Sequence, residues 1–243
     1  MPPFPAPRPP DDDAFASLGA EVTGCRACQR LVAWREQAAT DRRGGHLGES
    51  YWARPLPGFG DRRARIVLVG LAPAAHGGNR TGRMFTGDRS GDFLFAALHR
   101  AGLANQPTST ALDDGLALTG VYVTAPVRCA PPDNRPTIEE RDRCAPFLAR
   151  EVTLLTRARL FLALGAYGYE ALWRLPGLAA GRRPKFGHGV EAELTPSPEG
   201  EPRTLLCSYH PSQRNVFTGL LTPEMFDGVL ARACGLVGLA GPA

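Results

Sequence analysis

The sequence predicts a single doubly wound α/β domain with a mostly parallel sheet. Short, continuous apolar runs recur along the chain and are typical of strands that are buried on both faces. They alternate with segments whose apolar residues have helical spacing, which is the pattern of parallel strands joined by helices. With 243 residues, the chain is long enough to bury the core of one such domain.

The expected elements follow in chain order. Residues 1–13 join a proline tract to three aspartates, which predicts a disordered tail whose acidic end caps a helix from Ala14 to about Thr23. Residues 14–243 then form the domain, with an irregular glycine-rich stretch at 43–60. Apolar runs predict strands at 64–70, 118–125, 160–164, 190–194 and 204–208. Helical spacing predicts helices at 90–101, from a capping box at 137–140 with a kink at Pro146, at 167–173 and at 223–239.

Composition excludes several classes of protein. Hydrophobic residues are 43% and charged residues 21%, values that exclude collagen, coiled coils and wholesale disorder. No apolar run approaches the roughly 18 residues of a membrane span, and the N-terminal residues lack the apolar core of a signal peptide, so we expect an intracellular protein. The net charge is +4, and Lys185 is the only lysine. Arginine grips phosphate bidentately, which favours an anionic partner, although the codon usage of a GC-rich genome predicts the same composition.

The cysteines indicate a metal site. Cys25 and Cys28 form a close pair, and Cys129 and Cys144 are distant from it in sequence. In an intracellular chain this pattern favours metal binding over disulfides, although unliganded buried thiols remain an alternative. Four thiolates satisfy a zinc ion or an iron–sulfur cube, and spacing alone does not choose between them. One tight pair with two ligands from separate elements favours the cube, which would pin the N-terminal segment to the domain. The remaining Cys207 and Cys234 are expected in the core.

Two loops carry most of the polar chemistry. The first, residues 70–88, follows an expected strand and holds His76, Asn79, Arg80, Arg83 and Asp88 among several glycines. It matches neither a phosphate-binding Walker loop nor a dinucleotide fingerprint. The second, residues 209–215, places His210 at a strand end, with Pro211 stiffening the turn. Ligands of doubly wound sheets bind at the carboxyl ends of strands, so both loops are candidate site segments. The alternatives are a solvated surface loop and a structural histidine.

Five segments together resemble a known family. Gly70–Pro73, Asn79–Gly82, Phe85–Asp88, Cys129–Pro132 and His210–Ser212 closely resemble family 5 of the uracil-DNA glycosylase superfamily, a branch of bacterial and archaeal iron–sulfur enzymes. The similarity extends over approximately residues 20–235.

The resemblance implies a fold, a cofactor and an activity. The fold is a three-layer α/β/α arrangement, and a 4Fe–4S cluster is held by Cys25, Cys28, Cys129 and Cys144. The activity is removal of uracil and other deaminated bases from DNA by base flipping. The expected partner is therefore DNA, the expected place is the bacterial or archaeal cytoplasm at the nucleoid, and we expect a monomer.

The resemblance also suggests roles for single residues. His210 is expected to donate a hydrogen bond to the O2 oxygen of the departing base, and Phe85 to stack on the flipped base, unless it is simply a core aromatic. Asp88 or Asn79 would position the attacking water, and the sequence does not decide between them. Asp88 is also suited to capping a helix, which is the alternative role for it. The remaining expected contacts to substrate are Ala72, His76, Arg214 and Asn215, with Arg214, Asn215 and Val216 entering the minor groove. Arg80 and Arg83 are expected to contact phosphates.

Two departures from related families bear on specificity. Leu71 and Ala72 stand where other families place an acidic or amide side chain, as they do in family 5. The run 124–127 lacks the asparagine that reads the base edge in related cluster-bearing enzymes, which favours a broader substrate range. The alternatives are a strictly uracil-specific enzyme like family 4 and a non-catalytic iron–sulfur module that binds DNA or senses oxidation.

Overall fold

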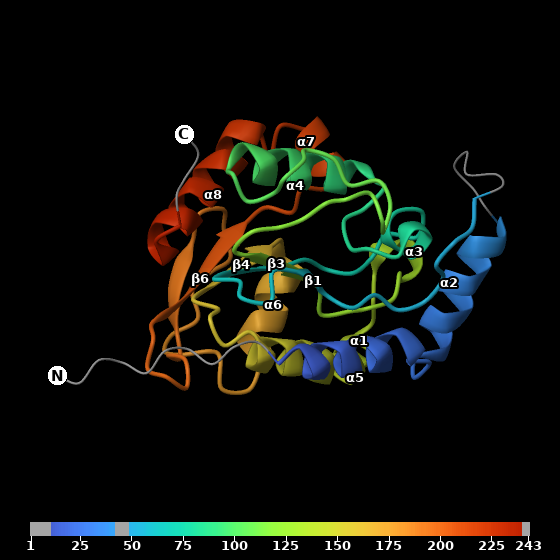
Figure 1. Cartoon of the computed structure of the whole chain (residues 1–243), viewed down its shortest axis with the longest axis horizontal. Coiled ribbons are helices and arrows are strands. Elements are labelled where there is room, and N and C mark those ends of the chain that lie inside the picture. Colours follow the sequence, from blue (N-terminus) through green and yellow to red (C-terminus); the bar gives the residue numbers. More distant parts are fainter. Residues whose placement is uncertain (1–10, 42–48, 240–243) are drawn as a thin grey trace.

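A six-stranded sheet forms the centre of the computed structural model, which describes residues 11–41 and 49–239 (Figure 1). The strands lie in the order β1-β3-β2-β4-β6-β5. Neighbours among the four inner strands are parallel, whereas β1 and β5 pair antiparallel at the two edges. The strand bounds are β1 Phe59–Gly60, β2 Ile66–Val69, β3 Val121–Thr124, β4 Leu160–Leu164, β5 Glu191–Leu194 and β6 Arg203–Ser208. The predicted, mostly parallel sheet is confirmed.

Helices cover both faces of this sheet, which confirms the three-layer arrangement (Figure 1). One layer contains α4 (Arg89–Arg100), α7 (Gln213–Phe217) and α8 (Pro223–Val237), and the other contains α1 (Asp12–Gly24), α5 (Ile138–Leu154) and α6 (Ala166–Arg174). Two further helices, α2 (Gln29–Asp41) and α3 (Gly78–Thr81), lie together at one end of the sheet. A short 3₁₀ turn, Pro132–Asn134, precedes α5.

The continuous apolar runs are explained by two separate cores. Ile66 and Leu68 of β2 pack into the core beneath α4 and α8, whereas Val67 and Val69 pack into the core beneath α5 and α6. Successive strand residues point to opposite faces, so a strand covered on both sides needs an apolar residue at every position. All four residues of β2 are completely buried.

Three local features add to or correct what the sequence predicted. Helix α1 begins at Asp12 with Asp11 as its N-cap, so the predicted tail is wrong for residues 12 and 13, and residues 1–10 lie outside the described part. Pro146 lies within α5, and the helix continues past it to Leu154. Helix α2 was not expected, because its buried residues are few and are mixed with polar ones. Within the described residues, no helix is long and apolar enough to cross a membrane.

Candidate functional site

A cleft of about 510 Å³ lies at the carboxyl ends of the inner strands, where the two candidate loops meet. This volume is in the usual range for a site that encloses a small molecule. Its wall is formed by Leu71, Ala72, Ala74, Met84, Phe85, Asp88, Arg89, Ser90, Ala125, Asn134, His210, Ser212, Gln213 and Arg214. The loops after β2, β3 and β6 therefore build a single site, as the doubly wound topology requires.

His210 lies just beyond the end of β6 and lines the cleft. Burial lowers the pKa of its imidazole to about 4, because a cation is poorly solvated there. The ring is therefore neutral at physiological pH and carries one N–H donor. Its main chain is fixed from two sides. The Asn215 side-chain amide donates to the His210 carbonyl at 2.9 Å, and a Cβ at Gly165 would lie 3.0 Å from the His210 Cβ.

Phe85 forms the opposite part of the cleft and stacks on His210, with ring centroids 5.8 Å apart and planes at 28°. Its backbone is left-handed, with φ +53, a conformation that an aromatic residue adopts only when its surroundings require it. Two glycines leave the space that Phe85 needs. A Cβ at Gly70 would lie 2.7 Å from the ring, and a Cβ at Gly91 would lie 1.8 Å from the Phe85 carbonyl oxygen.

Asp88 caps a helix and also lies in the cleft wall. Its Oδ1 accepts hydrogen bonds from the backbone amides of Ser90 at 2.9 Å and Gly91 at 3.0 Å, so Asp88 is the N-cap of α4. It also lines the cleft. Burial raises the pKa of the carboxyl group, and the two amide hydrogen bonds oppose that rise.

Asn79 and His76 do not line the cleft. The Asn79 side chain is 1% exposed and donates to the main-chain oxygen of Arg35 at 3.1 Å, so it faces α2. His76 contacts the Tyr51 hydroxyl at 2.9 Å through its Nδ1. Neither residue belongs to the cleft wall that His210 and Asp88 share, so the expected catalytic role of Asn79 and substrate contact of His76 have no support in the lining of the cleft.

The arginines expected to contact phosphates instead hold the loop together. Arg83 is 5% exposed, forms an ion pair with Asp114 at 2.6 Å, and donates to Ser109 at 2.8 Å. Arg80 donates to the Gly87 carbonyl at 3.0 Å and to Glu49. Both guanidinium groups are thus used within the protein, which corrects that expectation.

The remaining expected substrate contacts surround the cleft. Ala72 and Arg214 line it directly, and Arg214 is exposed. Asn215 acts behind His210 through the hydrogen bond described above, so its side-chain amide is engaged within the protein. Ala125 forms part of the cleft wall, and the neighbouring Thr124 is turned into the core, where it donates to Glu151 at 2.5 Å.

Three residues in the segments around the site were missed by sequence reasoning. Asn134 lines the cleft from the turn before α5, with a left-handed φ of +55. Its segment of Pro, Asp and Asn predicts a turn. The pattern does not predict that this turn reaches the same cleft as His210, which lies 76 residues later in the chain. Phe217 ends α7 and is 89% exposed, and Leu220 in the following turn is 48% exposed. An amphipathic pattern assigns such residues to the core, so no sequence signal marked them as exposed.

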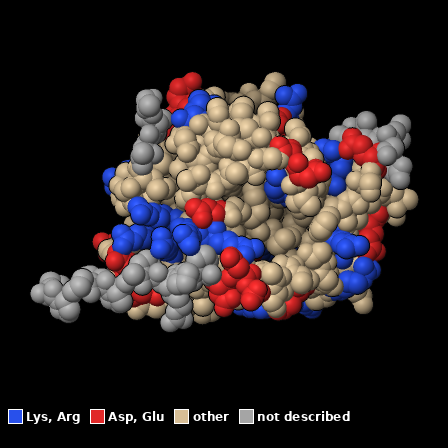
Figure 2. Space-filling model, viewed as in Figure 1, with Lys and Arg blue, Asp and Glu red and all other residues tan. Residues whose placement is uncertain are grey.

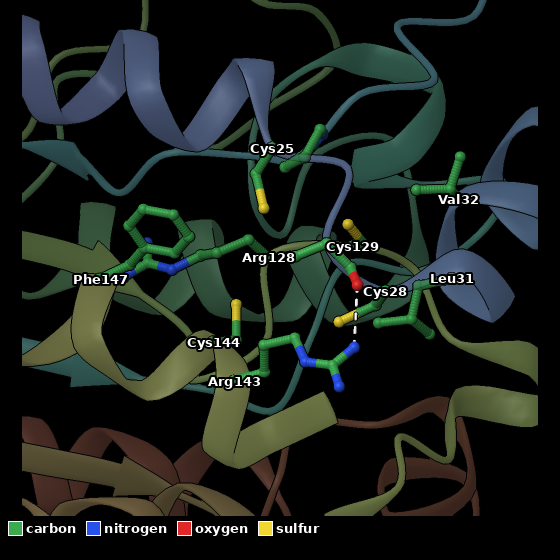
Figure 3. A pocket seen from close by; sticks show the side chains of 11 residues that line it. Cys25, Cys28, Leu31, Val32, Arg128, Cys129, Arg143, Cys144 and Phe147 are labelled. Carbon is green, nitrogen blue, oxygen red and sulfur yellow. Dashed lines mark hydrogen bonds between the residues drawn. The ribbon is translucent and has the colours of Figure 1, made fainter. Parts of the chain in front are cut away.

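The four predicted cysteines line one cavity beside the cleft (Figure 3). Cys25 and Cys28 come from the link between α1 and α2, Cys129 from the turn after β3, and Cys144 from α5. All are free thiols. Burial raises the pKa of Cys129 to about 11 and that of Cys144 to about 12, so these sulfurs are protonated at neutral pH unless a cation binds them. Ala72 packs against the same apolar group as Cys28, which joins this cavity to the cleft wall.

The four cysteine sulfurs surround a space and do not converge on a single point. Among the described residues, no three His, Cys, Asp or Glu side chains converge closely enough to hold a single metal ion. The four sulfurs surround a cavity, and Figure 3 draws them around one central space. Cys207 and Cys234 are completely buried in the two cores, as predicted.

Surface charge alone does not identify the site. Figure 2 shows basic and acidic side chains interspersed over one face, with a group of basic side chains where β6 lies in Figure 1. On that face the basic groups form no continuous track.

Comparisons with known proteins agree with the motifs. The uracil DNA glycosylase superfamily model matches residues 57–233. The type-5 uracil-DNA glycosylase of Thermus thermophilus is 52% identical over 229 residues, covering 94% of this chain and 100% of that protein. The type-5 enzyme of Mycobacterium leprae is 51% identical over 227 residues, covering 93% and 97%. A type-4 uracil-DNA glycosylase of Pyrobaculum aerophilum is 33% identical over 131 residues, covering 54% of this chain and 59% of that protein. The chain belongs to the uracil-DNA glycosylase superfamily.

Proposed function

We propose that this protein is a DNA repair glycosylase that hydrolyses the N-glycosidic bond of uracil, and of other deaminated bases, in DNA. The observation that carries the proposal is the cleft in which a neutral His210 faces Phe85 at the carboxyl edge of the sheet. The type-5 relatives, which match this chain over nearly its whole length, support the same activity.

The substrate base has to leave the duplex before it can react. Extruding a nucleotide costs a few kcal/mol, and least where the base is mispaired, as uracil is opposite guanine. The cleft supplies an apolar lining of Ala72, Phe85 and Ala125 for the extruded ring. Small side chains at positions 72 and 125 leave room for bases other than uracil, which supports a broader range than that of a strictly uracil-specific enzyme.

Bond cleavage leaves negative charge on the departing base. A donor preorganised toward the O2 oxygen stabilises that charge, and removing such a donor typically costs about 3 to 4 kcal/mol in the barrier. His210 is suited to this role because its neutral ring still carries one N–H group that can donate to the O2 oxygen. In the described part of the chain, no residue forms a hydrogen bond with its ring, which leaves the ring available to substrate. Asn215 holds the His210 carbonyl and keeps the ring in place.

Positive charge develops on the sugar, and Asp88 is the carboxyl group in the cleft wall. We assign to it, rather than to Asn79, the stabilisation of that charge and of the attacking water. Asp88 Oδ1 is used for capping α4, which fixes the orientation of the carboxylate. Asparagine is as good an N-cap as aspartate, so Asp88→Asn keeps the cap and removes only the charge.

The hole left by the base is filled from α7. Apolar wedges inserted at a base step are common in proteins that kink duplexes. Phe217 and Leu220 are the exposed apolar side chains next to the cleft-lining residues 212–214, and they fit a wedge better than the Asn215 expected from the sequence. Arg214 remains available to a phosphate.

The cysteine cavity fits an iron–sulfur cluster. A structural zinc needs four donors about 2.3 Å from one point, whereas the sulfurs of a cluster surround it at its corners. The arrangement of Cys25, Cys28, Cys129 and Cys144 around a cavity supports the second. A cluster bound there would pin the link between α1 and α2 to the turn after β3 and to α5. We further propose that the protein acts as a monomer on chromosomal DNA, at the nucleoid of the cytoplasm.

The test is release of free base from a duplex with one U·G pair under single-turnover conditions. We expect release without added reductant, and a loss of 100-fold or more for Asp88→Asn at unchanged duplex binding. A duplex that is bound in a gel but stays intact would identify a binding or redox module instead. A full rate for Asp88→Asn would reduce Asp88 to a helix cap. Iron and acid-labile sulfide per chain, with a broad visible absorbance, distinguish the cluster from zinc.

A further inference from the structure

Arg35 connects the cysteine cavity to the loop that carries the cleft. It lies on α2, and its side chain is 2% exposed. Its NH1 donates to the Cys129 Sγ at 2.9 Å, and its NH2 donates to the Cys25 carbonyl at 3.3 Å. One guanidinium thus holds two of the four cysteine segments, which come from distant parts of the sequence.

The charge of Arg35 has no ordinary counterpart. In the part of the chain that the structure describes, no carboxylate forms an ion pair with it, and its buried Nε has no hydrogen-bond partner. Arginine is not deprotonated in proteins, and a buried charge without a counter-charge is strongly destabilising. The sulfur of Cys129 is the polar side-chain atom that the guanidinium contacts, so a compensating negative charge in direct contact with it comes from the cysteine site.

The main chain of Arg35 reaches the cleft loop. Its carbonyl accepts a hydrogen bond from the Asn79 Nδ2 at 3.1 Å, and Asn79 is itself 1% exposed. The Asn79 carbonyl in turn accepts from the Ala53 amide at 3.0 Å. Asn79 lies in α3, between Ala72 and the pair formed by Phe85 and Asp88. A displacement of α2 would therefore break this hydrogen bond and loosen the loop that forms part of the cleft wall.

We propose that Arg35 and Asn79 are a positioning pair that makes the order of the 77–88 loop depend on negative charge at the cysteine site. The inference rests on the proposed metal cluster. With thiolates ligated, Arg35 is compensated and α2 presents its carbonyl to Asn79. Without that charge, or without the guanidinium itself, α2 is no longer held to the Cys129 turn through Arg35, so α2 moves and Asn79 loses its acceptor. This gives Asn79 a role in the reaction that acts through position, not through contact with substrate.

The pair is tested on the holoprotein with two readouts, neither of which is excision. One is amide hydrogen exchange of Arg80, Thr81 and Gly82, whose N–H groups bond to the carbonyls of Gly77 and Gly78. The other is the midpoint potential of the bound cluster, because hydrogen bonds to ligating sulfurs raise it. The variants are Arg35→Met, Arg35→Lys and Asn79→Ala. Arg143→Met is the matched control, since the exposed Arg143 lines the same cavity but donates to the Ala27 carbonyl and not to the main chain that binds Asn79 (Figure 3).

The variants separate the two halves of the pair. We expect Arg35→Met to lower the midpoint potential and to speed exchange of the three amides tenfold or more, and Arg35→Lys to restore part of both. We expect Asn79→Ala to speed the same exchange with the potential unchanged, and Arg143→Met to leave exchange at the wild-type rate. After a chelator removes the metal from the wild-type protein, we expect the three amides to exchange as fast as they do in Arg35→Met.

Specific outcomes overturn the inference. Arg35→Met with wild-type exchange, or Asn79→Ala with wild-type exchange, removes the link to the loop. If Arg35→Met does not fold, Asn79→Ala and the chelated wild type still decide the matter, because neither deletes the buried charge. A wild-type protein that contains metal and excises uracil, yet shows no change in exchange on chelation, keeps the proposed function and refutes the pair. A wild-type protein without metal refutes the proposed cluster first.

Discussion

At the scale of single residues, His210 is the group on which the proposed chemistry depends most. We expect His210→Gln to lower the single-turnover rate of uracil release by about 100- to 1000-fold, the usual cost of losing one preorganised donor. Duplex affinity, measured separately, should change little. Because burial lowers the pKa of His210 to about 4, the wild-type rate should show no inflection from this residue between pH 5.5 and 8. A titration near pH 6.5 that disappears in His210→Gln would contradict a neutral donor.

The contribution of Phe217 to the excision rate is predicted to depend on how the target base is paired. It is 89% exposed at the end of α7, the helix that begins with the cleft-lining Gln213 and Arg214. A wedge offsets the cost of unstacking, and that cost is larger for a paired base than for a mispaired one. We therefore expect Phe217→Ala to slow excision from U·A duplexes by at least tenfold more than from U·G duplexes. Leu112→Ala, which removes a 53% exposed side chain from a different loop, is the control. An equal loss on both duplexes would mean that Phe217 only contributes to binding.

At the scale of elements, the start of α4 is built around Phe85. A Cβ at Gly91 would lie 1.8 Å from the Phe85 carbonyl oxygen, too close to be accommodated without moving backbone. We expect Gly91→Ala to displace Phe85, to lower the free energy of unfolding by about 1 to 3 kcal/mol, and to reduce excision. The control is Gly228→Ala in α8, where an added Cβ meets nothing within 4 Å. That change should stabilise the helix by about 0.5 to 1 kcal/mol. Equal stabilities of the two variants, measured by denaturant unfolding, would refute the steric argument.

A buried ion pair ties the cysteine turn to α5. Arg128 and Glu151 are 1% and 2% exposed, and both guanidinium NH groups donate to the carboxylate, at 2.9 and 2.6 Å. Removing one partner of such a pair leaves an uncompensated buried charge, which typically costs about 3 to 5 kcal/mol. We expect that loss of unfolding free energy for Glu151→Gln in chemical denaturation. Glu21→Gln breaks the exposed pair with Arg150 and should change stability little. A mild effect of Glu151→Gln would show that Arg128 is compensated elsewhere.

The elements also show what sequence patterns determine. The strands β2, β4 and β6 were predicted within two residues, because burial on both faces imposes an apolar residue at each position. Helix α2 was missed because its inward residues, among them Arg35, are partly polar, so the apolar stripe that marks a helix is weak. The place of His210 in the cleft was predictable because it follows the end of β6, whereas Phe85 was expected there from the family resemblance. Asn79 was misplaced because its loop turns back toward α2, a contact between segments that no local pattern records.

At the scale of the whole molecule, His210 links the site to acid stability. Its folded pKa of about 4 lies below the ordinary value of 6.5, so the unfolded chain binds this proton more readily than the folded one. Stability therefore rises with pH between these two values and is lost as pH falls through them. One pKa unit is worth about 1.4 kcal/mol, so wild type should lose about that much more unfolding free energy than His210→Gln between pH 7.5 and 5.5. Asp88, whose pKa burial raises, contributes with the opposite sign, and this contribution is common to the wild type and His210→Gln. Denaturant unfolding of both proteins at the two pH values measures the difference, and identical losses would show that His210 is protonated in the folded protein.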